Sequence, residues 1–142
     1  MLSISFIIPC YNSERFIFSN IKKIIKKAKR LNIHYEIIII NDGSTDNTRL
    51  EIKKSKKIYK KIKFIDSKKN NGKSFSIRKG LKKSIFNYVI LLDADLAYFF
   101  YISKIVKELK KNTELVIVDR YHPRSTLKNK NLSIYQFCRK NI

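Results

Sequence analysis

Two carboxylates, separated by one residue, follow a strongly hydrophobic run of the sequence. The run YVILL at residues 88–92 leads directly into Asp93, Ala94 and Asp95. At the end of a strand two such carboxylates can face one cation. Mg²⁺ in proteins is usually held by one or two carboxylates, and substrate phosphate oxygens and water complete its shell. Asp93 and Asp95 are therefore candidate metal ligands and catalytic residues. The alternative is that one caps the next helix and the other is solvated.

A second acidic turn, NDGSTD at residues 41–46, follows the apolar run EIIII. There Asp42 can accept hydrogen bonds from the N–H groups of a nucleobase, and Gly43 allows the chain to turn. The alternative is a plain turn that caps the next helix through Ser44 or Asp46.

A third segment, NNGK at residues 70–73, has a glycine turn and a lysine at the start of a predicted helix. Lys73, Arg78 and the free N–H groups of a helix start suit a phosphate. The alternative is a solvated basic helix.

These three segments follow strands of one alternating pattern. Near-continuous apolar runs predict strands at residues 3–9, 35–40, 63–66, 88–92 and 115–118. Between them an apolar stripe from Ile17 to Ala28 predicts a first helix, and further helices are expected at residues 46–59, 73–84 and 99–111. Runs without alternation indicate strands buried on both faces, as in parallel sheets covered by helices. The fold class is therefore α/β, doubly wound, with ligands at the carboxyl ends of the strands.

The composition fits one domain with a real core. The chain has 142 residues, of which 44% are hydrophobic. Its formal net charge of +21 comes mostly from lysine pairs spread along the whole chain. We therefore expect no specific nucleic-acid partner and rather a basic face that touches anionic lipid. No signal peptide and no run long enough to span a membrane is found. Cys10 and Cys138 form no metal or disulfide motif.

In this order the segments are more specific than any one alone. The sequence resembles the family 2 glycosyltransferases of GT-A fold, which form a Rossmann-like three-layer sandwich around a mainly parallel sheet. The resemblance spans nearly the whole chain. Its motifs most resemble those of the polyprenyl- and dolichyl-phosphate sugar transferases. The segments that carry it are FIIPCYNSERFI, EIIIINDGSTDNT, NNGKSFSIRKGLKKS, YVILLDADLAY and LVIVDRYHPRS.

The resemblance implies a role for each matching position. The base and ribose pocket would be lined by Pro9, Tyr11, Glu14 and Asp42. The rest of the nucleotide sugar would contact Gly72, Lys73, Arg78, Ala94 and Arg120, while Asp93 and Asp95 would bind ribose and the diphosphate through Mg²⁺ or Mn²⁺. Three positions depart from the family pattern. Asn41 replaces a second Asp, Asp119 replaces a small residue, and Ala97 replaces a Gln that serves some relatives as a further metal ligand.

The implied activity is an inverting, metal-assisted transfer of a sugar from a UDP- or GDP-sugar to a polyprenyl or dolichyl phosphate. Such an acceptor is already anionic and needs little help from a general base. No Asp or Glu follows Asp119. We expect residues 1–142 to be one donor-binding domain that lacks part of the acceptor-side region. We also expect it to be cytoplasmic and peripheral at a membrane.

Two alternatives remain open: a non-catalytic remnant that binds a nucleotide sugar, and a basic nucleic-acid-binding module. A sugar-nucleotide pyrophosphorylase is disfavoured, since no Gly- and Arg-rich loop follows the first strand.

Overall fold

Four parallel strands form the centre of the sheet. The computed structural model describes residues 1–111, 113–118 and 135–139. Within them the strand order is β3-β2-β1-β4-β6-β5, in which the first four are mutually parallel and β6 runs antiparallel to both of its neighbours, β4 and β5. The strands are β1 (Ser3–Cys10), β2 (His34–Asp42), β3 (Ile62–Ser67), β4 (Tyr88–Leu91), β5 (Leu115–Val118) and β6 (Tyr135–Arg139).

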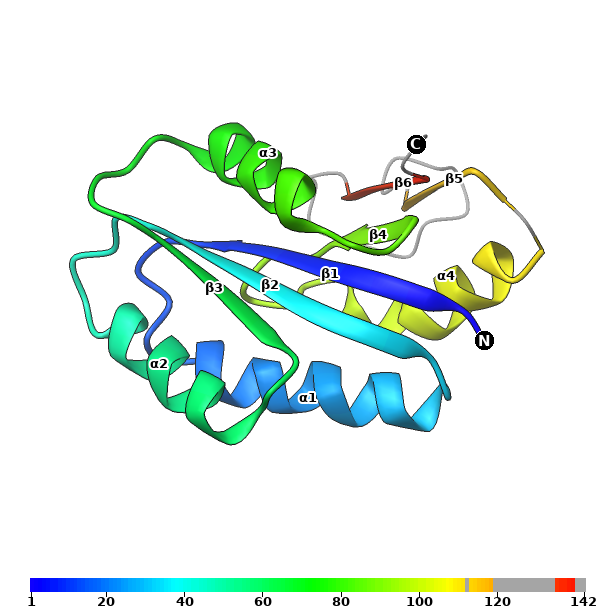
Figure 1. Cartoon of the computed structure of the whole chain (residues 1–142), viewed down its shortest axis with the longest axis horizontal. Helices are drawn as coiled ribbons and strands as arrows, with labels where there is room; N and C mark the ends of the chain where they lie inside the picture. The colour runs from blue at the N-terminus through cyan, green and yellow to red at the C-terminus, as the bar shows by residue number, and fades with distance from the viewer. Residues whose placement is uncertain (112, 119–134, 140–142) are drawn as a thin grey trace.

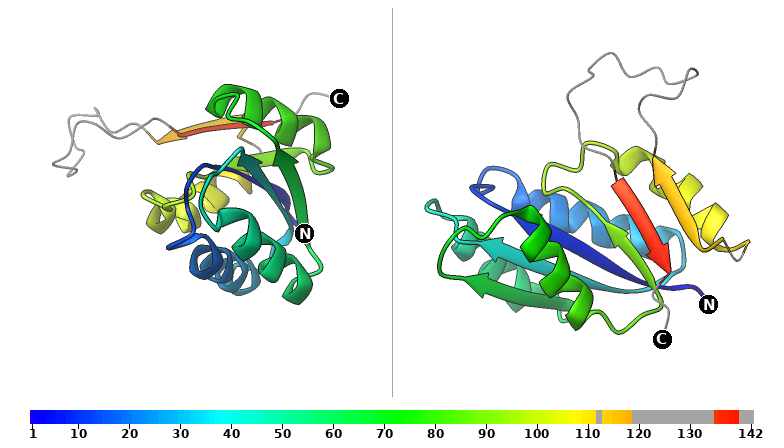
Figure 2. Two further views of the ribbon diagram at one scale, coloured as in Figure 1. Left: turned by 90° about the vertical axis from the view of Figure 1, so that its left-hand side faces the viewer. Right: turned by 90° about the horizontal axis from the view of Figure 1, so that it is seen from above.

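Helices cover the sheet on both faces and make three layers (Figures 1 and 2). One layer holds α1 (Ile17–Arg30), α2 (Thr48–Ile58) and α4 (Ile102–Leu109), the last preceded by the 3₁₀ turn η1 (Phe99–Tyr101). The helix α3 (Lys73–Lys83) lies on the opposite face. The predicted mainly parallel α/β sandwich is therefore confirmed.

Alternation along the central strands divides the core between these layers. Phe6 and Ile8 of β1 pack in the larger cluster, with the apolar stripe of α1 and with α4. Ile7 points the other way, into a smaller cluster that includes Leu81 of α3. A strand that is buried on both faces must be apolar throughout, which explains the uninterrupted isoleucines of β2.

The far side of the sheet differs from the sequence prediction. A strand at residues 115–118 is present, but β6 separates it from β4 and it pairs antiparallel with β6. The sequence analysis did not predict β6. Its segment YQFCR mixes polar and apolar residues, so it lacks the unbroken apolar run that marked the other strands. An antiparallel strand such as β6 near the edge of an otherwise parallel sheet is common.

Among the described residues, no helix is both long enough and apolar enough to cross a bilayer.

Candidate active site

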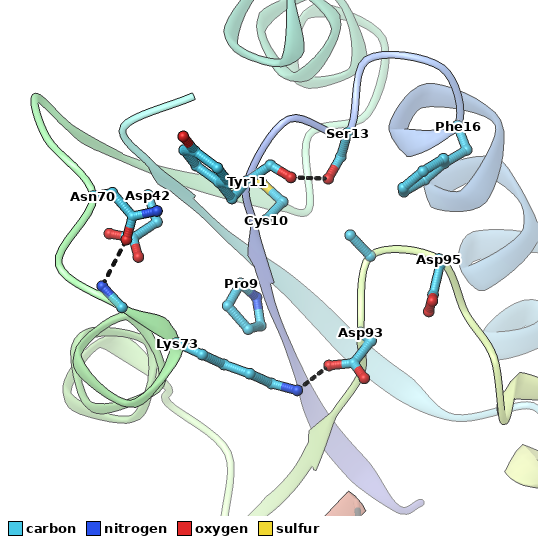
Figure 3. A pocket seen from close by; sticks show the side chains of 12 residues that line it. Pro9, Cys10, Tyr11, Ser13, Phe16, Asp42, Asn70, Lys73, Asp93 and Asp95 are labelled. Atoms are coloured by element: carbon cyan, nitrogen blue, oxygen red, sulfur yellow. Dashed lines mark hydrogen bonds and ion pairs between the residues drawn. The ribbon is translucent and has the colours of Figure 1, made fainter. Parts of the chain in front are cut away.

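A cavity of about 400 Å³ opens at the carboxyl ends of β1, β2 and β4 (Figure 3). It lies where the topology predicts a ligand site, next to the first strand and between the two halves of the parallel sheet. The cavity is lined by Pro9, Cys10, Tyr11, Ser13, Phe16, Asp42, Asn70, Gly72, Lys73, Asp93, Ala94 and Asp95. Eight of the eleven residues chosen from the sequence are in this group: Pro9, Tyr11, Asp42, Gly72, Lys73, Asp93, Ala94 and Asp95.

One wall of the cavity is the acidic turn after β4. The N–H of Leu96 donates to the carbonyl of Asp93 over 3.0 Å, which closes the turn. The N–H of Ala97 donates to Oδ1 of Asp95 over 3.1 Å. Lys73 reaches across from α3, and its Nζ lies 2.5 Å from Oδ1 of Asp93 (Figure 3). Two carboxylates and one ammonium group therefore share this wall.

The opposite wall is built around Asp42, which is buried at the end of β2. Its Oδ1 accepts the N–H of Asn71 over 3.0 Å, so the loop before α3 is held against the strand. Gly43 has a φ of +69°, and a Cβ there would lie 2.3 Å from the backbone carbon of Lys69. The approach of these two backbones therefore requires glycine.

The loop after β1 is fastened to the loop after β2 by reciprocal hydrogen bonds. The N–H groups of Asn12, Ser13 and Glu14 donate to side chains of the second loop and of the first residue of α2, over 3.0, 2.6 and 3.1 Å. In return, Oε2 of Glu14 accepts the N–H of Asn47 over 2.8 Å. Glu14 therefore fastens the two loops and does not line the cavity.

Asp46 has a lowered pKa because of its part in this fastening. Burial alone would raise the pKa of its carboxyl. Hydrogen bonds from the hydroxyl and N–H of Thr48 and from the N–H of Glu14 outweigh that effect. The carboxylate that orders these loops is consequently charged at neutral pH.

The two arginines chosen from the sequence are not at the described cavity. Arg78 lies on α3 with its side chain exposed and is absent from the lining. Arg120 lies outside the described residues.

Four lining residues were not chosen from the sequence: Cys10, Ser13, Phe16 and Asn70. The sequence could have indicated them only by position, because Cys10, Ser13 and Phe16 lie at or after the end of β1 and Asn70 lies in the loop before Gly72. Burial, followed by the charges of Asp46, Asp42 and Asp66, raises the pKa of the Cys10 thiol to about 12, so this thiol stays protonated.

Two solved structures have a similar fold. The mannosyltransferase PcManGT from Pyrobaculum calidifontis, in complex with GDP-Man and Mn²⁺, matches with a TM-score of 0.59 at 19% identity, over 65% of this chain and 27% of that one. TarS 1–349 from S. aureus, in complex with UDP-GlcNAc, matches with a TM-score of 0.62 at 20% identity, over 81% of this chain and 33% of that one. The fold and the cavity thus define a GT-A type of domain.

Sequence comparison assigns the family. The model of Glycosyl transferase family 2 matches residues 5–140, so the chain belongs to this family of glycosyltransferases. A poly-beta-1,6-N-acetyl-D-glucosamine synthase of Staphylococcus epidermidis is 36% identical over 119 residues, 79% of this chain. An uncharacterized glycosyltransferase of Haemophilus influenzae is 37% identical over 119 residues, 83% of this chain. The chain spans 26% and 36% of the lengths of these two relatives.

Proposed function

We propose that residues 1–142 form the donor-binding domain of a glycosyltransferase that takes its sugar from a nucleotide sugar. One observation carries the proposal: Asp42, Asp93 and Asp95, from two distant segments, line the same cavity. A nucleotide sugar has a base at one end and a charged diphosphate toward the other. The separate acidic walls and the lysine between them match that distribution of groups.

Each part of the donor has a complementary group in the cavity. Pro9 and Tyr11 offer flat apolar surface to the base, and Asp42 can accept its N–H groups. Gly72 and Lys73 lie at the start of α3, where the positive end of the helix dipole and the charge of the lysine favour a phosphate. Glu14, Arg78 and Arg120 stay assigned to the donor by resemblance alone.

Asp93 and Asp95 would hold a divalent cation, Mg²⁺ or Mn²⁺. Two carboxylates with room for phosphate oxygens and water fit such an ion. Among the described residues no cluster of three or more His, Cys, Asp or Glu could hold a metal. The ion would thus depend on the donor's own oxygens. When bound, it would stabilise the charge of the departing diphosphate.

For the acceptor we propose a polyprenyl or dolichyl phosphate. Its phosphate oxygen is already anionic, and it would attack the anomeric carbon as the bond to the diphosphate breaks, with inversion at that carbon. The described cavity shows no carboxylate beyond those assigned to the donor, which supports an acceptor that needs no base. The names of the staphylococcal relatives favour a second candidate, transfer of N-acetylglucosamine to the hydroxyl of a growing polysaccharide.

A lipid acceptor would require the domain to lie at a membrane. The sequence of α1 contains six basic residues and that of α2 five, against one acidic residue, Glu51. The two helices lie side by side (Figure 1). On α2 the exposed Leu50 and Ile58 accompany the lysines. Such a surface suits the anionic cytoplasmic leaflet, so we propose a peripheral position there.

The proposal is tested by thermal unfolding of the whole chain with UDP-glucose, UDP-GlcNAc or GDP-mannose, each with and without Mn²⁺. A ligand at 100 times its Kd adds about 2.7 kcal/mol to the free energy of unfolding. We expect one donor to raise the Tm with Mn²⁺. Asp95→Asn should abolish that gain, while Glu108→Gln, at a carboxylate on α4 outside the cavity, should preserve it.

Other outcomes separate the alternatives. No rise in Tm with any donor would refute the proposal. Binding of donor without transfer to a short polyprenyl phosphate or to an oligosaccharide of N-acetylglucosamine would indicate a non-catalytic remnant. Steeply salt-dependent binding of duplex DNA or RNA that is indifferent to Asp95→Asn would indicate a nucleic-acid-binding module.

A further inference from the structure

A buried amide on α1 reaches the acidic turn from a distant part of the chain. Asn20 is 4% exposed, and its Nδ2 donates to the carbonyl oxygen of Ala94 over 2.8 Å. The two residues are 74 positions apart in the sequence. Since Ala94 lies between Asp93 and Asp95, this hydrogen bond holds the middle of the turn that carries both carboxylates.

The neighbours of Asn20 fix the orientation of its amide. On the other side of the group, Nζ of Lys23 donates to Oδ1 of Asn20 over 3.0 Å. The carbonyl of Ala94 can only accept and the ammonium of Lys23 can only donate. If the amide were flipped, its oxygen would face the carbonyl oxygen of Ala94 and its NH₂ group would face the ammonium of Lys23, and neither pair could form a hydrogen bond. The observed orientation is therefore the one in which both neighbours are satisfied.

The turn itself is held mainly by local contacts. The hydrogen bonds from the N–H groups of Leu96 and Ala97 both end within the segment. Leu96 has a φ of +59°, a left-handed conformation that a leucine adopts at a cost. A side chain from another element that holds the Ala94 carbonyl would keep the turn in this conformation.

We propose that Asn20 is a positioning residue for the cation held by Asp93 and Asp95. The inference rests on the proposed function of the cavity. The bond to Ala94 fixes the backbone between the two aspartates, and so fixes the separation and direction of their carboxylates. Groups that orient metal ligands from behind typically change metal affinity 10- to 100-fold when they are removed.

The test measures UDP binding to the whole chain by calorimetry, with Mn²⁺ and with EDTA, and uses GDP in place of UDP if GDP-mannose is the donor that raises the Tm. In Asn20→Leu we expect the apparent affinity for Mn²⁺ in the presence of UDP to fall at least about tenfold. The affinity for UDP in EDTA should stay unchanged, because Asp42, Tyr11 and Gly72 lie on the other wall. Amide hydrogen exchange should accelerate at Leu96 and Ala97.

Two control variants separate positioning from a general loss of structure. Thr48→Val removes the 2.6 Å bond to the N–H of Ser13 on the opposite wall. It should weaken UDP binding equally with Mn²⁺ and with EDTA. Lys23→Met removes the outer bond to Asn20 and should change Mn²⁺ affinity little. If Asn20→Leu does not fold, Asn20→Asp keeps the shape of the side chain but cannot donate to Ala94.

The outcomes distinguish the inference from the proposed function. Should the unmodified chain bind neither UDP nor GDP more tightly with Mn²⁺ than with EDTA, the proposed function fails. Should the unmodified chain gain from Mn²⁺ and both Asn20 variants gain equally, the positioning role is wrong. An equal loss of UDP affinity with and without Mn²⁺ in the Asn20 variants would also overturn it, because that is what a merely structural residue would cause.

Discussion

The residue before Asp42 offers a test of how the turn after β2, at residues 41–46, is built. Asn41 and Asp66 are direct partners across the parallel strands β2 and β3. The amide of Asn41 donates to Oδ1 of Asp66 over 2.8 Å, and its Oδ1 accepts the N–H of Ser44 over 3.2 Å. The family resemblance of this segment implies an aspartate at this position, where this chain has Asn41. In this structure a carboxylate at position 41 would face Asp66.

The change Asn41→Asp should therefore destabilise the domain. It replaces a charge-assisted hydrogen bond by two like charges whose centres lie about 4 Å apart, a repulsion of about 4 kcal/mol at an effective dielectric constant of 20. Arg49, whose Nε lies 2.6 Å from Oδ2 of Asp66, offsets part of this, and Asp66 is 27% exposed to screening water. We expect a net loss of about 2–3 kcal/mol in the free energy of unfolding.

A double-mutant cycle measured by urea denaturation at neutral pH tests this reasoning. Asp66→Asn alone should cost about 1 kcal/mol or less, since it loses a partly exposed ion pair. The double variant Asn41→Asp/Asp66→Asn restores a carboxylate facing an amide. It should be more stable than Asn41→Asp alone, with a coupling energy of about 2 kcal/mol. If the two changes simply add, or if Asn41→Asp costs less than about 0.5 kcal/mol, the pair does not determine the residue at this position.

Two further predictions concern other parts of the fold. Glu36, buried at the opposite edge of the sheet, has its pKa lowered: burial raises it, but hydrogen bonds from Lys63, the Ser5 hydroxyl and the Ile85 N–H outweigh burial. It therefore stabilises the fold above its ordinary pKa of 4.5, and this contribution disappears as the pH falls through the lowered value. Glu36→Gln should lower the free energy of unfolding by about 2 kcal/mol at pH 7. It should also make the urea midpoint depend less on pH below pH 4.5, and an unchanged dependence on pH would contradict this role of Glu36. Gly43→Ala should lower the free energy of unfolding by about 2–4 kcal/mol, measured by urea denaturation, and displace the loop before α3, because strain at positive φ adds to a backbone clash. Gly72 has a φ of +89° but open space around it, so Gly72→Ala should cause strain alone. Equal displacement of the loop in both variants would refute this difference.

The sequence predicted the site best where position along a strand decides it. Asp42, Asp93 and Asp95 follow apolar runs directly, and the carboxyl ends of parallel strands meet at one edge. Side-chain direction was harder to predict. Arg78 is five residues after Lys73, which is about 140° around a helix with 3.6 residues per turn, so the two point to different sides.

Contacts between distant segments could not be predicted from the pattern. Asn20 lies within the apolar stripe of α1, where its type gives no sign that it meets Ala94. Glu14 matches a family position, but its hydrogen bond to Asn47 depends on how two loops pack. The strand β6 shows the same limit, since no pattern in its own five residues indicates that it pairs with β4.

The distribution of charge connects the site to the rest of the molecule. A chain with a formal net charge of +21 attracts a diphosphate from a distance, yet the cavity itself presents Asp42, Asp93 and Asp95 with Lys73 among them. An anionic donor would meet these carboxylates at close range, where their repulsion exceeds the screened attraction of distant lysines. A divalent cation, if held by Asp93 and Asp95 as proposed, would reverse the sign of the charge on that wall of the cavity. The affinity for the donor should therefore depend more strongly on the metal than on ionic strength. A surface that binds phosphates through lysines alone would show the opposite, an affinity that depends strongly on ionic strength and not on the metal.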